Sequence, residues 1–486
     1  MRRALYSGVS GLKTHQTKMD VIGNNIANVN TTAYKSQSVT FTELMYQTTQ
    51  AASGPNAATG TAGTNAKQIG LGSVSGAIST AITTPGSSQT TGNPFDIKIT
   101  GDSFFIVSNG GDKYFTRDGS FYVDAAGNLA TTSTGLNVMG WLPNPNDPNL
   151  IEQGPVEKLR IMSPENMTYE PEATEEAYVS GIIDKNDTDA GDVAGLGKRI
   201  ASTIYDNLGY AYTVTFTLKE TGTDGQYNVE LLDITNSNGV SLTEEYGLVP
   251  KNSDPATRKA AVSQIAAFET NNPAVLQYDP TTGQFSNIDG YDADGNAIRS
   301  IKLQFQSSVS GLSDPSDPSS TAITTNLGNF KEINVDFSKS SMFNNNGTST
   351  IGIVNGTETG LKAGRKLGEL SGVSIDKSGK IYASYDNGQT KLLGQIAVAS
   401  FANASGLQKE GDNLYSATLN SGVFDGIGVD VTAGGGYMST GVLEMSNVDL
   451  SAEFTEMITT QRGFQANSRI ITVSDTLLEE LVNLKR

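Results

Sequence analysis

The sequence lacks cysteine and contains only one histidine, His15, and one tryptophan, Trp141. Without cysteine, the chain cannot form disulfides, thiolate metal sites or a cysteine nucleophile. A single histidine argues against zinc hydrolases and Ser-His-Asp triads. Catalytic zinc sites commonly use two or three histidines, and a triad would require this one histidine to lie beside both a serine and an aspartate. We therefore expect no enzyme activity, and no catalytic, cofactor-binding or metal site.

Basic residues are outnumbered. The chain has 33 Lys and Arg against 51 Asp and Glu, which gives a net charge of −18. Binding to nucleic-acid phosphates requires a basic surface, so we expect no nucleic-acid partner. Residues 1–42 depart from this trend, because five basic residues there face a single acid, Asp20.

Long apolar runs are also absent. No segment reaches the roughly 20 apolar residues that cross a bilayer. Two arginines open the chain as in a signal peptide, but Ser7, Gly8, Ser10 and Gly11 interrupt the apolar residues that follow, and no cleavage site comes after them. We expect no membrane insertion and no cleaved signal peptide, while export by another machine stays open.

The two ends of the chain carry a helical pattern. An apolar residue recurs at every seventh position in both segments, which predicts two amphipathic helices with a coiled-coil-like seam. At 1.5 Å per residue, the helices would be roughly 45 and 52 Å long. The N-terminal stripe consists of Leu5, Val9, Leu12, Met19, Ile22 and Ile26, and the C-terminal stripe of Leu450, Phe454, Met457, Phe464, Ile471, Leu478 and Leu481.

Four asparagines mark the end of the first helix: Asn24, Asn25, Asn28 and Asn30. Asparagine tolerates the left-handed conformation that ends helices, so Asn28 or Asn30 is the expected stop. Asn24 and Asn25 still lie on the helix, and their amides need hydrogen-bond partners. A neighbouring chain could supply those partners.

One such helix alone is marginal in water, so we expect the two ends to pair. Their pairing could simply close one domain as a helical hairpin. We favour termini that also pack against other copies of the chain, because small and polar residues interrupt both stripes and suit close contact in a larger array. The predicted subunit interface comprises both stripes, the four asparagines and Gln461.

The middle of the chain has β character. Fifty-three glycines and alternating apolar and polar residues predict short strands joined by turns. D-x-x-G turns are expected at residues 124–127 and 376–379. The "DADGN" segment at 292–296 resembles part of a calcium loop but lacks its later ligands, so we interpret it as a turn.

These patterns predict a multi-domain chain in which β domains are nested between paired terminal helices. The expected parts are a helical core (1–30 plus 445–486), an extended linker or arm (31–96), an inner β domain (97–158 plus 364–444) and an outer β insertion of one or two domains (159–363). The arm could be a flexible linker or could lie along another surface.

The terminal segments also carry a family resemblance. "LYSGVSGLKTHQTKMDVIGNNIANVNTTAYKS" and "SNVDLSAEFTEMITTQRGFQANSRIITVSDTLLEELVNL" resemble the shared end segments of bacterial flagellar rod, hook and hook-filament junction proteins. "FFIVSNGGDKYFTRDGSFYVDAAGNLATTSTGLNVMGW" resembles the first β domain of the distal rod and hook members. "RIASTIYDNLGYAYTVTFTL" and "LLGQIAVASFANASGLQKEGDNLYSATLNSG" resemble the hook members.

This resemblance implies a structural subunit of the bacterial flagellar hook. Copies would leave through the flagellar export apparatus, uncleaved, and would add to a growing tip. They would form a curved, flexible tube outside the cell that transmits torque as a universal joint. The implied partners are the chain itself, the rod, the hook cap and the hook-filament junction proteins.

Three alternatives stay open at this stage. A rod or junction protein of the same family would form a different part of the axis. An all-β glycosidase would use a carboxylate pair. An adhesin would display residues 159–363 as a surface-binding module.

Overall fold

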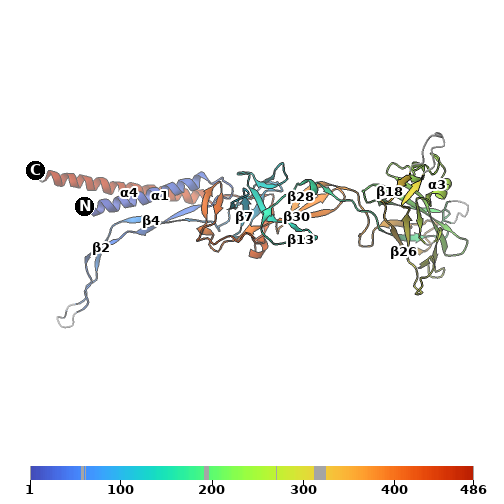
Figure 1. Cartoon of the computed structure of the whole chain (residues 1–486). Helices are drawn as coiled ribbons and strands as arrows, with labels where there is room; N and C mark the ends of the chain where they lie inside the picture. The colour runs from blue at the N-terminus through green and yellow to red at the C-terminus, as the bar shows by residue number, and fades with distance from the viewer. Residues whose placement is uncertain are drawn as a thin grey trace, which may run out of the picture. The chain divides into compact units, whose positions relative to one another are not determined.

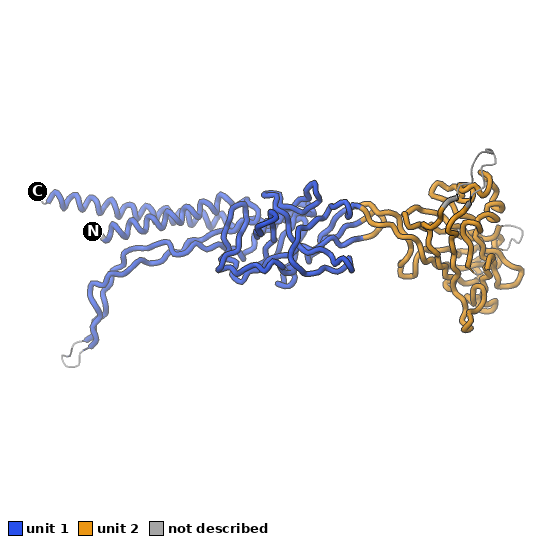
Figure 2. Tube along the Cα trace, viewed as in Figure 1, with its two compact units in different colours: residues 1–167, 371–384, 390–486 blue, residues 168–370, 385–389 orange. Residues whose placement is uncertain are grey.

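The computed structural model describes residues 2–55, 60, 62–190, 196–269, 271–310 and 324–484. The chain divides into two compact units (Figure 2). Unit 1 consists of residues 1–167, 371–384 and 390–486, and unit 2 consists of residues 168–370 and 385–389. Both ends of the chain therefore belong to unit 1.

Two long helices, α1 (Arg2–Ala27) and α4 (Leu450–Asn483), lie side by side in unit 1 (Figure 1). Asp449 caps the start of α4, because its carboxylate accepts hydrogen bonds from the N–H groups of Ser451 and Ala452. At the end of α1, the N–H of Asn28 bonds to the carbonyl of Asn24 at 3.2 Å. The predicted helix at each end is confirmed.

The segment after α1 forms a two-stranded arm. Strand β1 (Gln37–Glu43) pairs antiparallel with β4 (Ser73–Thr80), and β2 (Tyr46–Gln50) pairs antiparallel with β3 (Lys67–Gly70). The arm runs beside α1, where the hydroxyls of Thr14 and Ser73 are 3.4 Å apart. Its glycine- and threonine-rich sequence gave no clear alternation, and for that reason the hairpin was not predicted.

The remaining strands of unit 1 join the two halves of the chain. β7 pairs with β31, β8 with β33, and β11 with β30, all antiparallel. Phe104, Phe115 and Trp141 are buried in the core of this unit. The strands that lie wholly or partly in it are β5 (Ser88–Thr90), β6 (Ile97–Ile99), β7 (Phe104–Ser108), β8 (Lys113–Thr116), β9 (Phe121–Val123), β10 (Leu129–Thr131), β11 (Asn137–Trp141), β12 (Pro143–Asn144), β13 (Asp147–Ile151), β14 (Glu157–Lys158), β28 (Gly368–Ile375), β29 (Lys380–Tyr385), β30 (Thr390–Ile396), β31 (Val398–Ala399), β32 (Gln408–Gly411), β33 (Leu414–Ser416), β34 (Met438–Thr440) and β35 (Val442–Glu444).

Unit 2 contains two five-stranded sheets, ordered β20-β23-β26-β16-β27 and β17-β18-β19-β21-β22. Alternate residues of β26 are buried over most of its length, and side chains from both sheets contribute to one hydrophobic core. The elements are β15 (Thr168–Tyr169), β16 (Glu176–Ile183), β17 (Lys198–Tyr205), β18 (Ala211–Glu220), β19 (Gln226–Asn236), α2 (Leu242–Glu245), α3 (Pro255–Val262), β20 (Ala266–Phe268), β21 (Ala274–Tyr278), β22 (Phe285–Ile288), β23 (Ser300–Phe305), β24 (Ser308–Ser310), β25 (Thr324–Asn326), β26 (Ile333–Met342) and β27 (Gly352–Asn355).

The predicted turns are confirmed. The N–H of Gly127 bonds to the carbonyl of Asp124, and Gly379 bonds likewise to Asp376. In the "DADGN" segment, the Oδ1 atom of Asp292 accepts the N–H groups of Asp294 and Asn296. That carboxylate oxygen closes a turn, as the sequence indicated.

Candidate assembly interface

Helices α1 and α4 pack antiparallel to each other. A methyl group at Gly8 would lie 3.2 Å from Ile471 Cγ1, so the start of α1 faces the second half of α4. Farther along α1, Lys18 Nζ lies 2.9 Å from Glu456 Oε2. As residue numbers rise along α1, the numbers of the contacting residues in α4 fall.

Glycine allows the two helices to approach closely. A methyl group at Gly463 would lie 2.7 Å from Cε1 and Nε2 of His15, and one at Gly11 would lie 2.6 Å from Nδ2 of Asn467. These distances are shorter than normal carbon contacts, so a larger residue would force a shift. The closest contact runs through small and polar residues of α1, Gly11 and His15, and not through the predicted apolar series.

Except for Leu450, the apolar residues at seven-residue steps are half-buried in both helices. The other predicted interface residues of the two helices are either buried or exposed. Seven-residue steps alone did not predict this separation. The half-buried residues are Leu5, Leu12, Met19, Ile26, Met457, Phe464, Ile471 and Leu478. Ile22 is buried, whereas the exposed positions are Val9, Leu450, Phe454, Gln461 and Leu481.

Asn25 is buried, and its amide uses its full hydrogen-bonding capacity within the chain. Nδ2 donates to the carbonyl of Gln37 and to Oε1 of Glu453, both at 2.8 Å. Oδ1 accepts the N–H of Gln37 at 3.0 Å and the hydroxyl of Tyr34 at 3.2 Å. With two donors and two acceptor sites occupied, Asn25 needs no neighbouring chain, contrary to the expectation from sequence.

The other asparagines are more exposed. Asn24 donates from Nδ2 to the hydroxyl of Tyr34, and Asn28 donates from Nδ2 to the carbonyl and to Oδ1 of Asn24. Asn30 is exposed. Partners for Asn24 and Asn28 thus also lie in this chain, within ten residues along the sequence.

The side chain of His15, on α1, lies between α4 and the arm. Its ring meets the ring of Phe41 edge-on, with the centroids 5.6 Å apart, and it occupies the space beside Gly463. The Nδ1 atom is buried and has no hydrogen-bond partner among the described residues. Burial, followed by the nearby charge of Lys18, lowers the pKa of the imidazole.

The arm and α4 both present exposed apolar side chains. On the arm these include Phe41, Met45 and Ile78, whereas Ile82 at its base is buried. On α4 they are distributed along the helix, and each keeps a large exposed fraction although α1 packs against the same helix. We call these side chains the outer face of α4: Phe454, Ile458, Ile470, Val473, Leu477 and Leu481.

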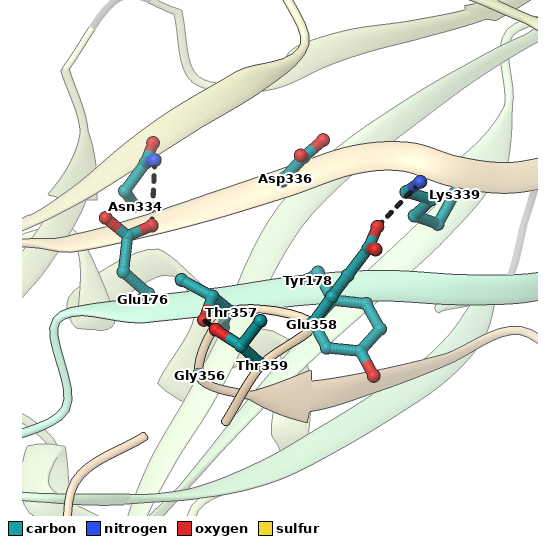
Figure 3. A pocket seen from close by; sticks show the side chains of 10 residues that line it. Glu176, Tyr178, Asn334, Asp336, Lys339, Gly356, Thr357, Glu358 and Thr359 are labelled. Carbon is teal, nitrogen blue, oxygen red and sulfur yellow. Dashed lines mark hydrogen bonds and ion pairs between the residues drawn. The ribbon is translucent and has the colours of Figure 1, made fainter. Parts of the chain in front are cut away.

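Unit 2 carries a cleft of about 310 Å³ lined by β16, β26 and the loop after β27 (Figure 3). Within it, Lys339 Nζ lies 2.6 Å from Glu358 Oε1, and Asn334 Nδ2 donates to Glu176 Oε2 at 3.0 Å. These polar groups neutralise and bond one another. The cleft therefore has the character of a solvated sheet face.

The described part of the chain contains neither a cluster of metal ligands nor a membrane-spanning helix. No three His, Asp or Glu side chains come close enough together there to hold a metal ion. None of the helices in that part is both long enough and apolar enough to cross a bilayer.

Three segments match known protein families. Residues 5–35 match the flagella basal body rod protein family, residues 98–171 the D1 domain of the flagellar hook protein FlgE/F/G family, and residues 439–484 the C-terminal family of flagellar basal body rod FlgEFG proteins. These matches cover nearly all of α1, the whole of α4 and part of the strands of unit 1.

Full-length relatives decide the assignment. The chain is 32% identical to the flagellar hook protein FlgE of Treponema pallidum over the whole of both chains. It is 30% identical to FlgE of Escherichia coli, over 99% of this chain and all of that one. The chain belongs to the flagellar hook protein family. It is also 28% identical, over the full length of both chains, to the flagellar basal-body rod protein FlgG of Bacillus subtilis. Membership of the hook family gives the chain a structural role in the flagellum.

Proposed function

We propose that copies of this hook-family chain polymerise through α1 and α4 into the curved tube of the flagellar hook. The observation that carries this proposal is the outer face of α4, whose six apolar side chains remain 44–59% exposed after α1 has packed against the helix. An apolar face of this kind on a long helix calls for another helix to cover it.

The energy available from covering this face is large enough to drive assembly. Full burial of a Leu, Ile, Val or Phe side chain contributes roughly 1.5–3 kcal/mol. Ile458 and Val473 are 59% and 57% exposed, so each retains about half of that gain for a contact with another chain. Summed over the face, several kcal/mol per subunit offset the loss of freedom on association.

The same proposal gives each part of the chain a place. The paired helices (1–30 plus 445–486) form a coiled-coil-like core that lines the tube, and the arm (31–96) lies outside them. The inner β domain (97–158 plus 364–444) and the outer insertion (159–363) form the shells. A head-to-tail contact that does not close on itself generates such a helical polymer.

We further propose that subunits are exported uncleaved through the flagellar secretion channel and assemble outside the cell. Torque then passes from the rod through the hook to the junction proteins and the filament, with the hook cap holding the growing tip. The hook acts as a universal joint, a mechanical and not a catalytic role.

Charge substitution on the outer face tests the proposal. We expect Ile458→Asp and Val473→Asp to leave the purified chain soluble and its β units folded, but to abolish polymer growth. Gln465→Asp, at an exposed polar position of the same helix, is the matched control and should polymerise normally. Normal tubes from either apolar-to-acid variant would contradict the proposal.

The similarity to a Bacillus subtilis rod protein supports a second candidate, a subunit of the distal rod. Electron microscopy of the isolated polymer separates the two roles. A curved, flexible tube supports the hook, and a straight, stiff tube supports the rod.

A further inference from the structure

A charged cluster is buried in unit 1, away from the contact between α1 and α4. Glu444 Oε1 lies 2.9 Å from Lys35 Nζ, and Glu444 Oε2 lies 3.4 Å from Arg117 Nε. At most 1% of each of these three side chains is exposed. The N–H of Gly86 also donates to Glu444 Oε1 at 2.9 Å. We call these four residues the Glu444 cluster.

The cluster joins every segment through which the chain passes between the helices and the β strands. Lys35 follows α1, and Glu444 ends the last strand before α4. Gly86 lies where the arm returns, and Arg117 follows β8. One carboxylate therefore holds four segments that are far apart in the sequence.

Backbone contacts reinforce the same junction. The N–H of Ala33 donates to the carbonyl of Glu444 at 2.8 Å. The side chain of Asn447 accepts the N–H of Ser36 at 2.8 Å and donates to the carbonyl of Ala81 at 2.9 Å. The path out of α1 and the path into α4 are thus bonded directly to each other.

The two basic side chains of the cluster also donate hydrogen bonds to backbone carbonyls. Lys35 Nζ donates to the carbonyl of Thr84 at 2.7 Å, and Arg117 Nη1 donates to the carbonyls of Gly101 and Ser103. Burial alone would raise the pKa of Glu444, but the charges of Arg117 and Lys35 outweigh it and hold that pKa below its ordinary value. Glu444 is accordingly an anion with fixed partners.

Stability alone does not account for this arrangement. Buried ion pairs are often no more stabilising than apolar residues of the same size, because desolvation opposes the attraction. Their distinctive contribution is geometry, since charged hydrogen bonds accept only a narrow range of positions. An ionic cluster at this junction between two parts of a unit suits a role in fixing direction.

We propose that Glu444 is a positioning residue that fixes the direction in which the paired helices leave the strands of unit 1. The junction at residues 33–36 and 442–447 is then stiff, although the sequence left open that residues 31–96 are a flexible linker. The consequence for torque transmission rests on the proposed function, whereas the stiffness of the junction can be measured on the soluble chain.

The absence of cysteine makes a direct test possible, because introduced cysteines will be the only labelling sites. Spin labels at Val448→Cys, just before the Asp449 cap of α4, and at Asp112→Cys, in the turn between β7 and β8, report the distance across the junction without requiring α4 to be folded in the soluble chain. We expect a single narrow distance distribution in the otherwise unaltered chain. Glu444→Gln, which removes the charge at nearly constant volume, should replace this peak by a broad distribution.

Glu358→Gln is the matched control, because it removes a carboxylate from the exposed ion pair with Lys339 in unit 2. It should leave the distribution narrow. Hydrogen exchange of β7 serves as a check on folding. If β7 keeps its protection while the distribution broadens, Glu444 sets direction; if both are lost together, its role is general stability and the proposal fails.

A second variant covers the case in which Glu444→Gln does not fold. Lys35→Met leaves Glu444 with Arg117 and the Gly86 N–H, and should give intermediate broadening with β7 still protected. An unchanged distribution in this variant, or in a folded Glu444→Gln chain, would overturn the proposal. Failure of the chain to polymerise would instead count against the proposed function, because the distance measurement requires no polymer.

Discussion

Gly463 is the position at which the packing of α1 against α4 can be tested most sharply. Alanine is favoured over glycine in a helix interior by about 1 kcal/mol, so Gly463→Ala would stabilise an isolated helix. In the pair, the new methyl group would lie 2.7 Å from two atoms of the His15 ring. The ring is held by Phe41 on another side, and overpacking of this kind costs about 1–3 kcal/mol.

A second glycine supplies the reference. A methyl group at Gly23, also in a helix, has no neighbour within 4 Å in this chain. Gly23→Ala therefore gains helix propensity without a clash. Both variants gain the same helix propensity, so this gain cancels when their stabilities are compared. We expect the remaining difference in stability to equal the overpacking cost of about 1–3 kcal/mol per subunit.

The assay is the thermal dissociation of assembled hooks, followed by far-UV circular dichroism. We expect Gly463→Ala to lower the midpoint relative to Gly23→Ala, and His15→Ala in the same chain to recover part of the loss, because the two residues are in contact. If Gly463→Ala stabilised hooks as much as Gly23→Ala, the close approach of the two helices at this point would be refuted.

Three further predictions use the same assay. The pKa of His15 is lowered from its ordinary value of 6.5, so the unfolded chain takes up the proton first as the pH falls. Stability should be present above pH 6.5 and should fall as the pH drops below it, and His15→Gln should remove this dependence more than the control Lys13→Gln does. If His15→Gln changed the pH dependence less than Lys13→Gln, the reasoning would be contradicted. Asn25→Ala should cost about 1–3 kcal/mol of stability, because it leaves the N–H and the carbonyl of Gln37 without the Asn25 side chain as partner. Asn24 is exposed, so Asn24→Ala should change stability little. Equal effects of the two substitutions would show that burial at Asn25 is unimportant. Asp449→Ala should cost about 0.5–2 kcal/mol through loss of the cap of α4, and Asp449→Ser should restore most of it; no loss in the alanine variant would argue against the cap.

The sequence predicted features that depend on local pattern. Seven-residue steps gave both helices and a half-buried series, because amphipathic periodicity is a property of one helix. The turns at Asp124 and Asp376 followed from the chemistry of Asp and Gly over four residues. Asp449 or Ser451 could be named as the cap because both stand at the start of an apolar-periodic segment, and the structure places Asp449 there.

Features that depend on distant residues could not be predicted in the same way. Asn25 bonds Glu453, and Lys35 pairs with Glu444, across more than four hundred residues of chain. The line of contact between α1 and α4 runs through Gly11 and His15 because glycine in one helix admits a polar side chain of the other. That choice depends on the partner helix, so an apolar periodicity read from one helix missed it.

The central claim is that the apolar faces of the two terminal helices become buried only when many chains assemble. Amide hydrogen exchange of residues 2–27 and 450–483, compared between the dilute soluble chain and assembled hooks, tests this most directly. Because the pairing of α1 and α4 leaves most of their apolar side chains half-buried or exposed, we predict that it is not stable without other copies: exchange is fast in the soluble chain, where the helices are disordered, and protection is strong in hooks. Equal and strong protection of both helices in the dilute soluble chain would contradict the claim.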